Sequence, residues 1–192
     1  MRFGIMAMQL EALVPTGIPA DQVMAKITAF DHAGLAKSLA DRGFNPVELG
    51  GDLGMFLPQA YSPDSVERLK GLKSEGLGYT LHLPLWSVEP STPLTPVRKG
   101  SVEAVVQAIQ ATKPLEPEVY VLHATGALAA EFYNMKISEM ARMLILRQFQ
   151  AGARASIKAI LTNGMDRRPA KSEPAQASLP LHDNVRGPDY YH

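Results

Sequence analysis

Two histidines in this sequence stand where two apolar runs stop. His82 closes the run that begins at Tyr79, and His123 closes the run that begins at Val119. Short continuous apolar runs are typical of buried parallel strands, and a polar side chain that ends such a run lies at the carboxyl edge of the sheet. Two neutral imidazoles from neighbouring strands, which lie about 4.8 Å apart, can share one zinc, manganese or iron ion. We therefore predict a divalent-metal site at His82 and His123, against the alternative of two histidines that only make backbone hydrogen bonds.

A carboxylate follows a third strand-like run. Glu48 lies near the end of the run 46–49, directly before the glycine-rich segment 50–54. A carboxylate at that place can bind a metal or polarise a substrate hydroxyl, and the alternative is a solvated loop residue. The glycines lack the spacing of a dinucleotide-binding or phosphate-binding loop, so they predict a turn. Trp86, four residues after His82, either walls a pocket or packs in the core.

The last part of the chain holds a second group of metal-capable side chains. His182, Asp183, Asp189 and His192 fall within eleven positions. Short His/Asp clusters of this kind bind metals, but a polar tail also contains such residues by chance. The residues alone leave both interpretations open.

The elements that would position these residues alternate along the chain. Strand-like runs are followed by segments with helical periodicity, and this pattern favours an α/β protein made of parallel βα units. The expected strands are 3–8, 46–49, 78–83 and 119–123, and the expected helices are 31–42, a segment from 62, a segment from 95, and 138–161. Four βα units are therefore predicted.

Specific residues mark the expected helix ends. Gly43 can adopt the left-handed conformation that closes the first helix, and Ser62 followed by Pro63 is a capping start signal. Thr95 with its following proline repeats that signal. The last helix has a wide apolar stripe, which predicts burial, formed by Met140, Leu144, Phe149, Ala153, Ile157 and Ile160.

The composition changes after residue 164. Segment 165–180 is rich in Pro, Ala, Ser, Arg and Lys and has no periodicity, which is typical of a linker. We therefore divide the chain into the βα units at 1–164, a linker-like segment at 165–180 and a tail at 181–192.

Overall composition narrows the classes of function. Of the 192 residues, 46% are hydrophobic and 20% are charged, which is ordinary for a globular protein. Nineteen basic residues balance nineteen acidic ones, so no net field attracts nucleic acid or an anionic membrane. We expect a small-molecule partner, and the alternative is a local basic groove. Cysteine is absent, which excludes disulfides and thiolate ligands. Without a signal-peptide core or a membrane-spanning run, we expect a cytoplasmic protein.

Four segments carry a resemblance to a known family: Arg2-Phe3-Gly4-Ile5, Gly43-Phe44-Asn45-Pro46-Val47-Glu48-Leu49, His82-Leu83-Pro84 and Tyr120-Val121-Leu122-His123. Together they resemble the xylose-isomerase-like TIM-barrel superfamily, also called AP endonuclease family 2. That superfamily contains sugar and sugar-phosphate isomerases and epimerases, and endonuclease-IV-like phosphodiesterases. The two histidine motifs, in this order and at this spacing, are its most specific part. Segments 80–85 and 113–117 also resemble the cobamide-remodelling phosphodiesterase branch.

The resemblance implies a TIM-barrel-like fold and a set of site residues. His82 and His123 match two metal-binding histidine positions, and Glu48 matches a glutamate common at the end of the second strand. The family continues with a glutamate ligand on the fifth strand and an Asp-x-x-His pair on the sixth, and neither is found here in a strand context.

The tail resembles a later barrel strand and its loop with two departures. Pro180 stands where the family has a ligand histidine, and His182 lies two residues further on, which is the same face of a strand. Asp189 and His192 are separated by two residues where the endonuclease-like loop has one. By this resemblance His182, Asp189 and His192 are further metal-ligand candidates.

These implications define the expected function. We expect a zinc- or manganese-dependent isomerase or epimerase that acts on a sugar or sugar phosphate. The alternatives are a metal-dependent phosphodiester hydrolase acting on a phosphate ester, and an inactive relic of half a barrel. A complete barrel typically has about 250 residues, so we expect an incomplete barrel. Four parallel strands leave two open edges, which predicts a homo-oligomer.

Overall fold

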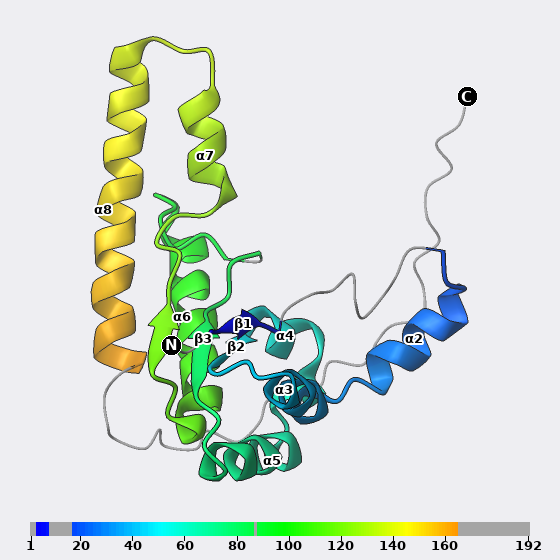
Figure 1. Ribbon diagram of the computed structural model, residues 1–192. Helices are drawn as coiled ribbons and strands as arrows, with labels where there is room; N and C mark the ends of the chain where they lie inside the picture. The colour runs from blue at the N-terminus through cyan, green and yellow to red at the C-terminus, as the bar shows by residue number, and fades with distance from the viewer. Residues whose placement is uncertain (1–2, 8–16, 87, 165–192) are drawn as a thin grey trace.

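The computed structural model describes residues 3–7, 17–86 and 88–164. Within them, four strands form one parallel sheet in the order β1-β2-β3-β4, and helices follow the strands (Figure 1). The strands are β1 (Ile5–Met6), β2 (Val47–Gly50), β3 (Tyr79–His82) and β4 (Val119–Val121). The helices are α2 (Ala20–Thr28), α3 (His32–Asp41), α4 (Gly51–Phe56), η1 (Pro58–Tyr61), α5 (Pro63–Ser74), α6 (Thr95–Thr112), η2 (Lys113–Leu115), α7 (Ala127–Asn134) and α8 (Glu139–Gly164). The predicted α/β class with four βα units is confirmed.

The strand register divides the sheet into two faces. Successive side chains of a strand point to opposite faces, and residues paired across parallel strands share a face. The inner face carries Met6, Glu48, Gly50, Thr80, His82, Val119 and Val121, and the outer face carries Ile5, Val47, Leu49, Tyr79, Leu81 and Tyr120. The candidate site residues of the strands therefore all lie on the inner face.

The outer face forms the core of the protein. Leu49 and Leu81 are at most 1% exposed, and they join one apolar cluster with side chains from α3, α5 and α6. Tyr79 is also buried there, and its hydroxyl donates a hydrogen bond to the Leu69 carbonyl at 2.9 Å. Burial raises the pKa of Tyr79, so the hydroxyl keeps the proton that it donates. Burial of each leucine side chain stabilises the fold by about 1.5–3 kcal/mol.

The inner face is much less covered. Met6 is 38% exposed and Val119 is 52% exposed, while Glu48 and Thr80 are partly exposed. Among the larger side chains of the inner face, His82 alone is buried, with 7% of it exposed. Parallel sheets normally have both faces covered. Among the residues that the structure describes, helices therefore cover one face of the sheet and leave most of the other face open.

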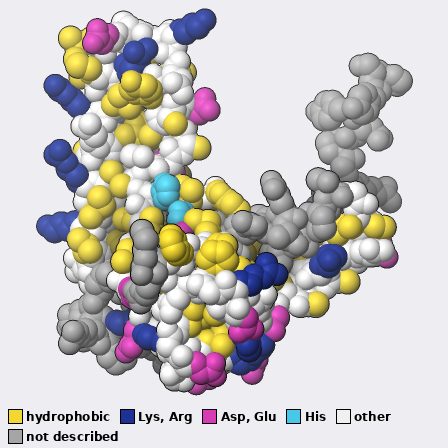
Figure 2. Space-filling model, viewed as in Figure 1, with side chains coloured by type: hydrophobic (Ala, Val, Ile, Leu, Met, Phe, Trp, Pro, Cys, Tyr) yellow, Lys and Arg dark blue, Asp and Glu magenta, His cyan; other side chains and the backbone are white. Residues whose placement is uncertain are grey.

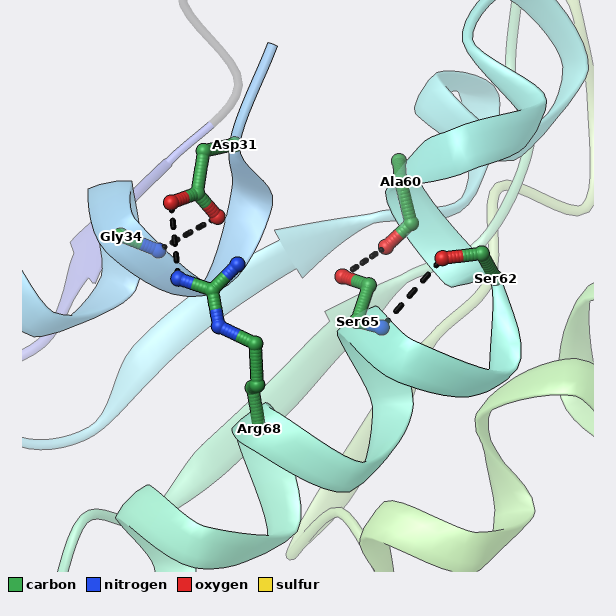
Figure 3. A network of polar contacts seen from close by, with 6 residues as sticks. All are labelled: Asp31, Gly34, Ala60, Ser62, Ser65 and Arg68. Atoms are coloured by element: carbon green, nitrogen blue, oxygen red, sulfur yellow. Dashed lines mark hydrogen bonds and ion pairs between the residues drawn. The ribbon is translucent and has the colours of Figure 1, made fainter.

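Polar contacts fix the starts of α3 and α5 and join the two helices (Figure 3). The Asp31 carboxylate accepts a hydrogen bond from the Gly34 N–H at 2.9 Å, and the Ser62 hydroxyl accepts one from the Ser65 N–H at 3.3 Å. Arg68 of α5 donates to Asp31 at 2.8 Å. The hydrogen bonds from Arg68 and Gly34 lower the pKa of Asp31. The predicted start at Ser62 is confirmed, as is the left-handed Gly43 after α3, with φ of 93°.

Helix α8 is less buried than its apolar stripe predicted. It runs beside α6 and, with α7, extends beyond the sheet (Figure 1). Phe149 and Ile160 are buried, but Met140, Leu144 and Ile157 are 62%, 53% and 36% exposed. The prediction that the whole stripe is buried is wrong, because α6 covers only part of it.

Several element boundaries also differ from expectation. The glycine-rich segment predicted as a turn forms helix α4, and of the strand predicted at 3–8 the described residues 3–7 form a strand at Ile5–Met6. Helices α2 and α7 were not predicted. No helix among the described residues has the length and apolar character needed to cross a membrane. The proposed linker at 165–180 and tail at 181–192 lie outside the described residues.

Candidate metal centre

The fold brings His82 and His123 together. His82 is the last residue of β3, and His123 lies two residues beyond the end of β4. Their Nε2 atoms are 3.0 Å apart, and their ring centroids are 4.9 Å apart. His82 is buried while His123 is exposed, so the pair lies at the surface of the carboxyl edge of the sheet. Figure 2 shows histidine side chains reaching the surface near the middle of the molecule among hydrophobic groups.

The hydrogen-bond partner of His82 fixes its tautomer. Its Nδ1 is 3.1 Å from the Leu83 carbonyl oxygen, which can only accept, so Nδ1 carries the hydrogen. With the hydrogen on Nδ1, the Nε2 atom of His82 presents a lone pair to His123. Without a cation between the rings, the His123 Nε2–H donates to that lone pair. A metal-binding histidine in proteins typically has this arrangement, with the non-ligating nitrogen donating to a carbonyl or carboxylate.

The spacing of the two nitrogens fits a shared cation. Two nitrogens each 2.0–2.1 Å from one zinc ion lie about 2.9 Å apart at a right angle and about 3.4 Å apart at a tetrahedral angle. The observed 3.0 Å falls within this interval. In the described part of the chain, no third His, Cys, Asp or Glu forms a metal-capable cluster with this pair. The described residues of one copy therefore offer two ligands, which is fewer than the three or four of a typical zinc site.

Glu48 lies on the same face of the sheet but one strand away. It is the second residue of β2 and is paired in register with Thr80, whose hydroxyl lies 3.3 Å from the Glu48 Oε2 atom. Gly50, two residues later, is the residue paired with His82. Glu48 is thus nearer the amino end of the strands than the histidine pair. This position orients its carboxylate into the open inner face rather than into the metal pair.

A buried carboxylate that the sequence did not single out holds the loop after His82. Asp52 of α4 is fully buried and accepts hydrogen bonds from the backbone N–H groups of Leu85 at 2.9 Å and Trp86 at 3.3 Å. Its neighbour Gly51 touches the same loop, because a Cβ atom added there would lie 2.7 Å from Pro84 Cδ. Trp86, a candidate pocket wall, is 51% exposed and contacts Phe56.

A second carboxylate connects the loops that follow the two histidines. Glu89 lies in the loop between β3 and α6, and it accepts hydrogen bonds from the N–H groups of Gly126 at 2.8 Å and Leu128 at 3.1 Å. These groups belong to the start of α7, directly after His123, where a negative charge is favourable. The Ser91 hydroxyl also donates to Glu89. Glu89 therefore restrains the segment that carries His123 relative to the segment that carries His82.

The end of β2 is held by a buried tyrosine. The Tyr61 hydroxyl donates to the Gly50 carbonyl at 2.9 Å, and burial raises the pKa of Tyr61. Its ring packs edge-on against His32, a histidine outside the site. Burial lowers the pKa of His32, whose Nδ1 lies 3.1 Å from the Ala60 carbonyl. His32 is therefore a neutral packing residue.

The other predicted ligands belong to the tail of the chain. His182, Asp189 and His192 fall after residue 164, beyond the described residues. Asp52 and Glu89 were missed because neither stands in a motif. Their partners are backbone N–H groups more than thirty positions away.

Comparison with solved structures identifies the architecture. No protein-family model matches the chain. The chain is similar to the crystal structure of a D-tagatose 3-epimerase-like protein, with a TM-score of 0.56 and 18% sequence identity. The likeness covers 86% of this chain and 49% of that chain, so this chain spans about half the length of the solved one. The fold is a partial TIM barrel.

Among curated proteins, part of this chain is similar in sequence to a transposase. A 92-residue stretch is 38% identical to "Putative transposase for insertion sequence IS408" of Burkholderia multivorans. The stretch is 47% of this chain and 17% of that protein. It is longer than the segment 165–192, so it includes part of the barrel units. The match covers too little of the transposase to assign the chain to its family.

Proposed function

We propose that His82 and His123 hold a divalent cation, zinc or manganese, and that the partial barrel serves as a sugar or sugar-phosphate isomerase or epimerase. The observation that supports this best is the 3.0 Å approach of two Nε2 atoms at the carboxyl edge of a parallel sheet. TIM-barrel enzymes keep their catalytic groups at that edge. The likeness in fold to a D-tagatose 3-epimerase-like protein supports a sugar as the class of substrate.

The two histidines have different tasks in this proposal. His82 is prepared to bind, because its Nδ1–H is held by the Leu83 carbonyl and its Nε2 lone pair is already exposed to the shared position. His123 must move its hydrogen from Nε2 to Nδ1 before its Nε2 can bind. A divalent cation held there polarises carbonyl and hydroxyl oxygens of a bound sugar.

Glu48 is the proposed proton-transfer residue. Isomerisation or epimerisation next to a carbonyl needs a base that removes a proton from carbon and later returns one. Glu48 supplies a carboxylate on the open inner face, and the hydrogen bond with Thr80 orients it through Oε2. A Glu48→Gln variant should then keep the cation and lose turnover, because the amide is isosteric but cannot accept the proton.

Metal binding is tested first and without any substrate. The purified chain is stripped with a chelator and titrated with zinc and with manganese, and bound metal is measured by elemental analysis. We expect His82→Ala and His123→Ala each to weaken binding at least tenfold. Glu103→Gln, which replaces an exposed carboxylate of α6 far along the chain from both histidines, serves as the control and should leave metal binding unchanged. Equal metal binding by the parent and both site variants would reject the proposed centre.

Substrate class is tested with two panels of compounds. Sugars and sugar phosphates are incubated in deuterated water, where an isomerase or epimerase exchanges the hydrogen next to the carbonyl, and exchange is followed by NMR. Phosphodiesters are tested for hydrolysis in parallel. Metal-dependent exchange that Glu48→Gln abolishes supports the proposal, and hydrolysis alone supports the phosphodiesterase alternative. A chain that binds no metal and acts on neither panel is the inactive half barrel.

The transposase match does not lead us to propose a DNA-transfer function. The matched stretch represents 17% of that protein. Nucleic-acid binding proteins typically carry a strong excess of basic residues, whereas this chain has a formal net charge of zero. The histidine pair and the open inner face are instead suited to a small, oxygen-rich ligand.

A further inference from the structure

The inner face of the sheet carries exposed apolar side chains. In the interior of a TIM barrel, such side chains pack against those of the opposite strands. Here Val119 is 52% exposed and Met6 is 38% exposed, and Val121 is partly exposed. Exposed apolar side chains on a sheet face favour association, because burying them removes apolar area from water.

The two edges of the sheet are also open within the described residues. β1 pairs with β2 and β4 pairs with β3, and neither pairs with another described strand on its other side. The Val121 carbonyl accepts a hydrogen bond from the Leu83 N–H, so Val121 is committed to β3. An unpaired strand edge presents N–H and C=O groups that readily pair with another strand.

The geometry of a barrel makes these two edges complementary. A TIM barrel has eight parallel strands, and this sheet has four, all parallel. A two-fold axis along the barrel would place β4 of one copy beside β1 of the other, parallel, at both junctions. The same operation would place the two open inner faces opposite each other. Two-fold symmetric dimers are the commonest assemblies of identical chains.

We propose that a second copy of this chain closes the barrel edge to edge. A partner with four parallel strands in the same order would satisfy both junctions at once, and a second copy of this chain is such a partner. This fold covers 49% of the solved chain that it resembles, so two copies would together match about the length of that chain. A formal net charge of zero means that two copies do not repel each other.

Closure would also complete the metal centre, a consequence that rests on the proposed function. Each copy supplies His82 and His123 at the carboxyl edge, and the two-fold axis brings both edges to the same mouth. Four imidazoles and two Glu48 carboxylates would then surround one opening. One copy alone offers two histidine ligands among its described residues.

The experiment measures the mass of the full chain in solution by light scattering, with a chelator present throughout. We expect about twice the chain mass of 20.8 kDa. Val119→Lys should shift the measured mass to that of the monomer, because the lysine is exposed in a single copy but would be buried in the closed barrel. Val97→Lys, at a valine of α6 that is 51% exposed, is the matched control and should remain dimeric.

Two further variants keep the outcome decisive. Met6→Lys places a charge at the opposite edge of the sheet and should also give the mass of the monomer. Circular dichroism checks that each variant is folded. Leu144→Lys tests the exposed apolar side of α8 and should leave the dimer intact. The proposal is overturned if the parent chain has the mass of a monomer in the presence of chelator. It is also overturned if Leu144→Lys disrupts the dimer and Val119→Lys does not. Because no metal is present, this result is independent of the metal titration.

Discussion

The two faces of the sheet differ in what holds them. On the outer face, Leu49 and Leu81 are buried in a cluster with three helices, and dispersion and the hydrophobic effect stabilise the fold there. On the inner face, the histidine pair and Glu48 stand among exposed or partly exposed neighbours. The residues proposed for chemistry are therefore not those that stabilise the fold.

The carboxyl edge connects the two faces through polar contacts. Asp52 and Glu89 hold backbone N–H groups of the loops that follow β3 and β4, and so restrain His82 and His123. A site at strand ends and in the following loops needs such contacts, because its side chains lack the dense packing of the outer face. Separating stability from site geometry by mutation is the direct way to test this division.

The largest effect is expected from the outer face. Leu81→Ala should lower the free energy of unfolding by about 2–5 kcal/mol, because a fully buried leucine is replaced by a cavity. Thr80→Ala, the next residue along on the inner face, should cost less than about 1 kcal/mol. Urea denaturation followed by circular dichroism measures both. Equal losses would show that the inner face is as tightly packed as the outer one.

A smaller loss is expected where α4 touches the loop after His82. Gly51→Ala should destabilise the fold by about 1–3 kcal/mol, because its Cβ atom would lie 2.7 Å from Pro84 Cδ and 3.0 Å from the His82 carbonyl oxygen. Gly71→Ala in α5 is the control. Nothing lies within 4 Å of a Cβ there, so alanine should gain up to about 1 kcal/mol from helix propensity. Thermal and urea unfolding of both variants decide, and a neutral Gly51→Ala would show that this contact is loose.

Glu89 separates stability from site geometry most clearly. Glu89→Gln should cost about 1–2 kcal/mol of stability, because the charged acceptor for the start of α7 is lost. If the pair binds metal as proposed, zinc affinity should fall by about 10–100-fold, as is typical when a group that orients a ligand is removed. Glu103→Gln, an exposed glutamate of α6, should change neither quantity. Unaltered zinc affinity in a measurably destabilised Glu89→Gln would remove Glu89 from the site.

The sequence predicted the strands and the histidine pair because both depend on local signals. A continuous apolar run marks a buried strand, and His82 was found because it ends one. Register then follows from parallel pairing, which places His123 near His82 although β4 stops at Val121. Capping residues such as Ser62 marked helix starts for the same reason, since their partner lies three residues away.

The remainder depends on contacts between distant residues. Asp52 and Glu89 are ordinary loop or helix carboxylates in the sequence, and their hydrogen-bond partners become visible only in the fold. The spacing of the apolar residues in α8 predicted a helix. It did not predict how much of that apolar stripe α6 would cover. Leu144 is consequently exposed where burial was predicted.

The smallest effect is expected from the ion pair between α3 and α5. Arg68 and Asp31 lie 2.8 Å apart with side chains about half exposed, so solvent and salt screen their attraction. The pKa of Asp31 is lowered in the folded state, chiefly by Arg68 and then by the Gly34 N–H. The stability it contributes is therefore present above the ordinary aspartate pKa and is lost as the pH falls through the folded-state value. Arg68→Gln should weaken this acid dependence and leave the Gly34 cap. Melting curves between about pH 5 and about pH 2.5, at low and high salt, measure the difference. If Arg68→Gln instead lowered the melting temperature strongly at neutral pH, and high salt did not reduce that effect, the prediction would be wrong. The ion pair between α3 and α5 would then stabilise the fold together with the buried outer face.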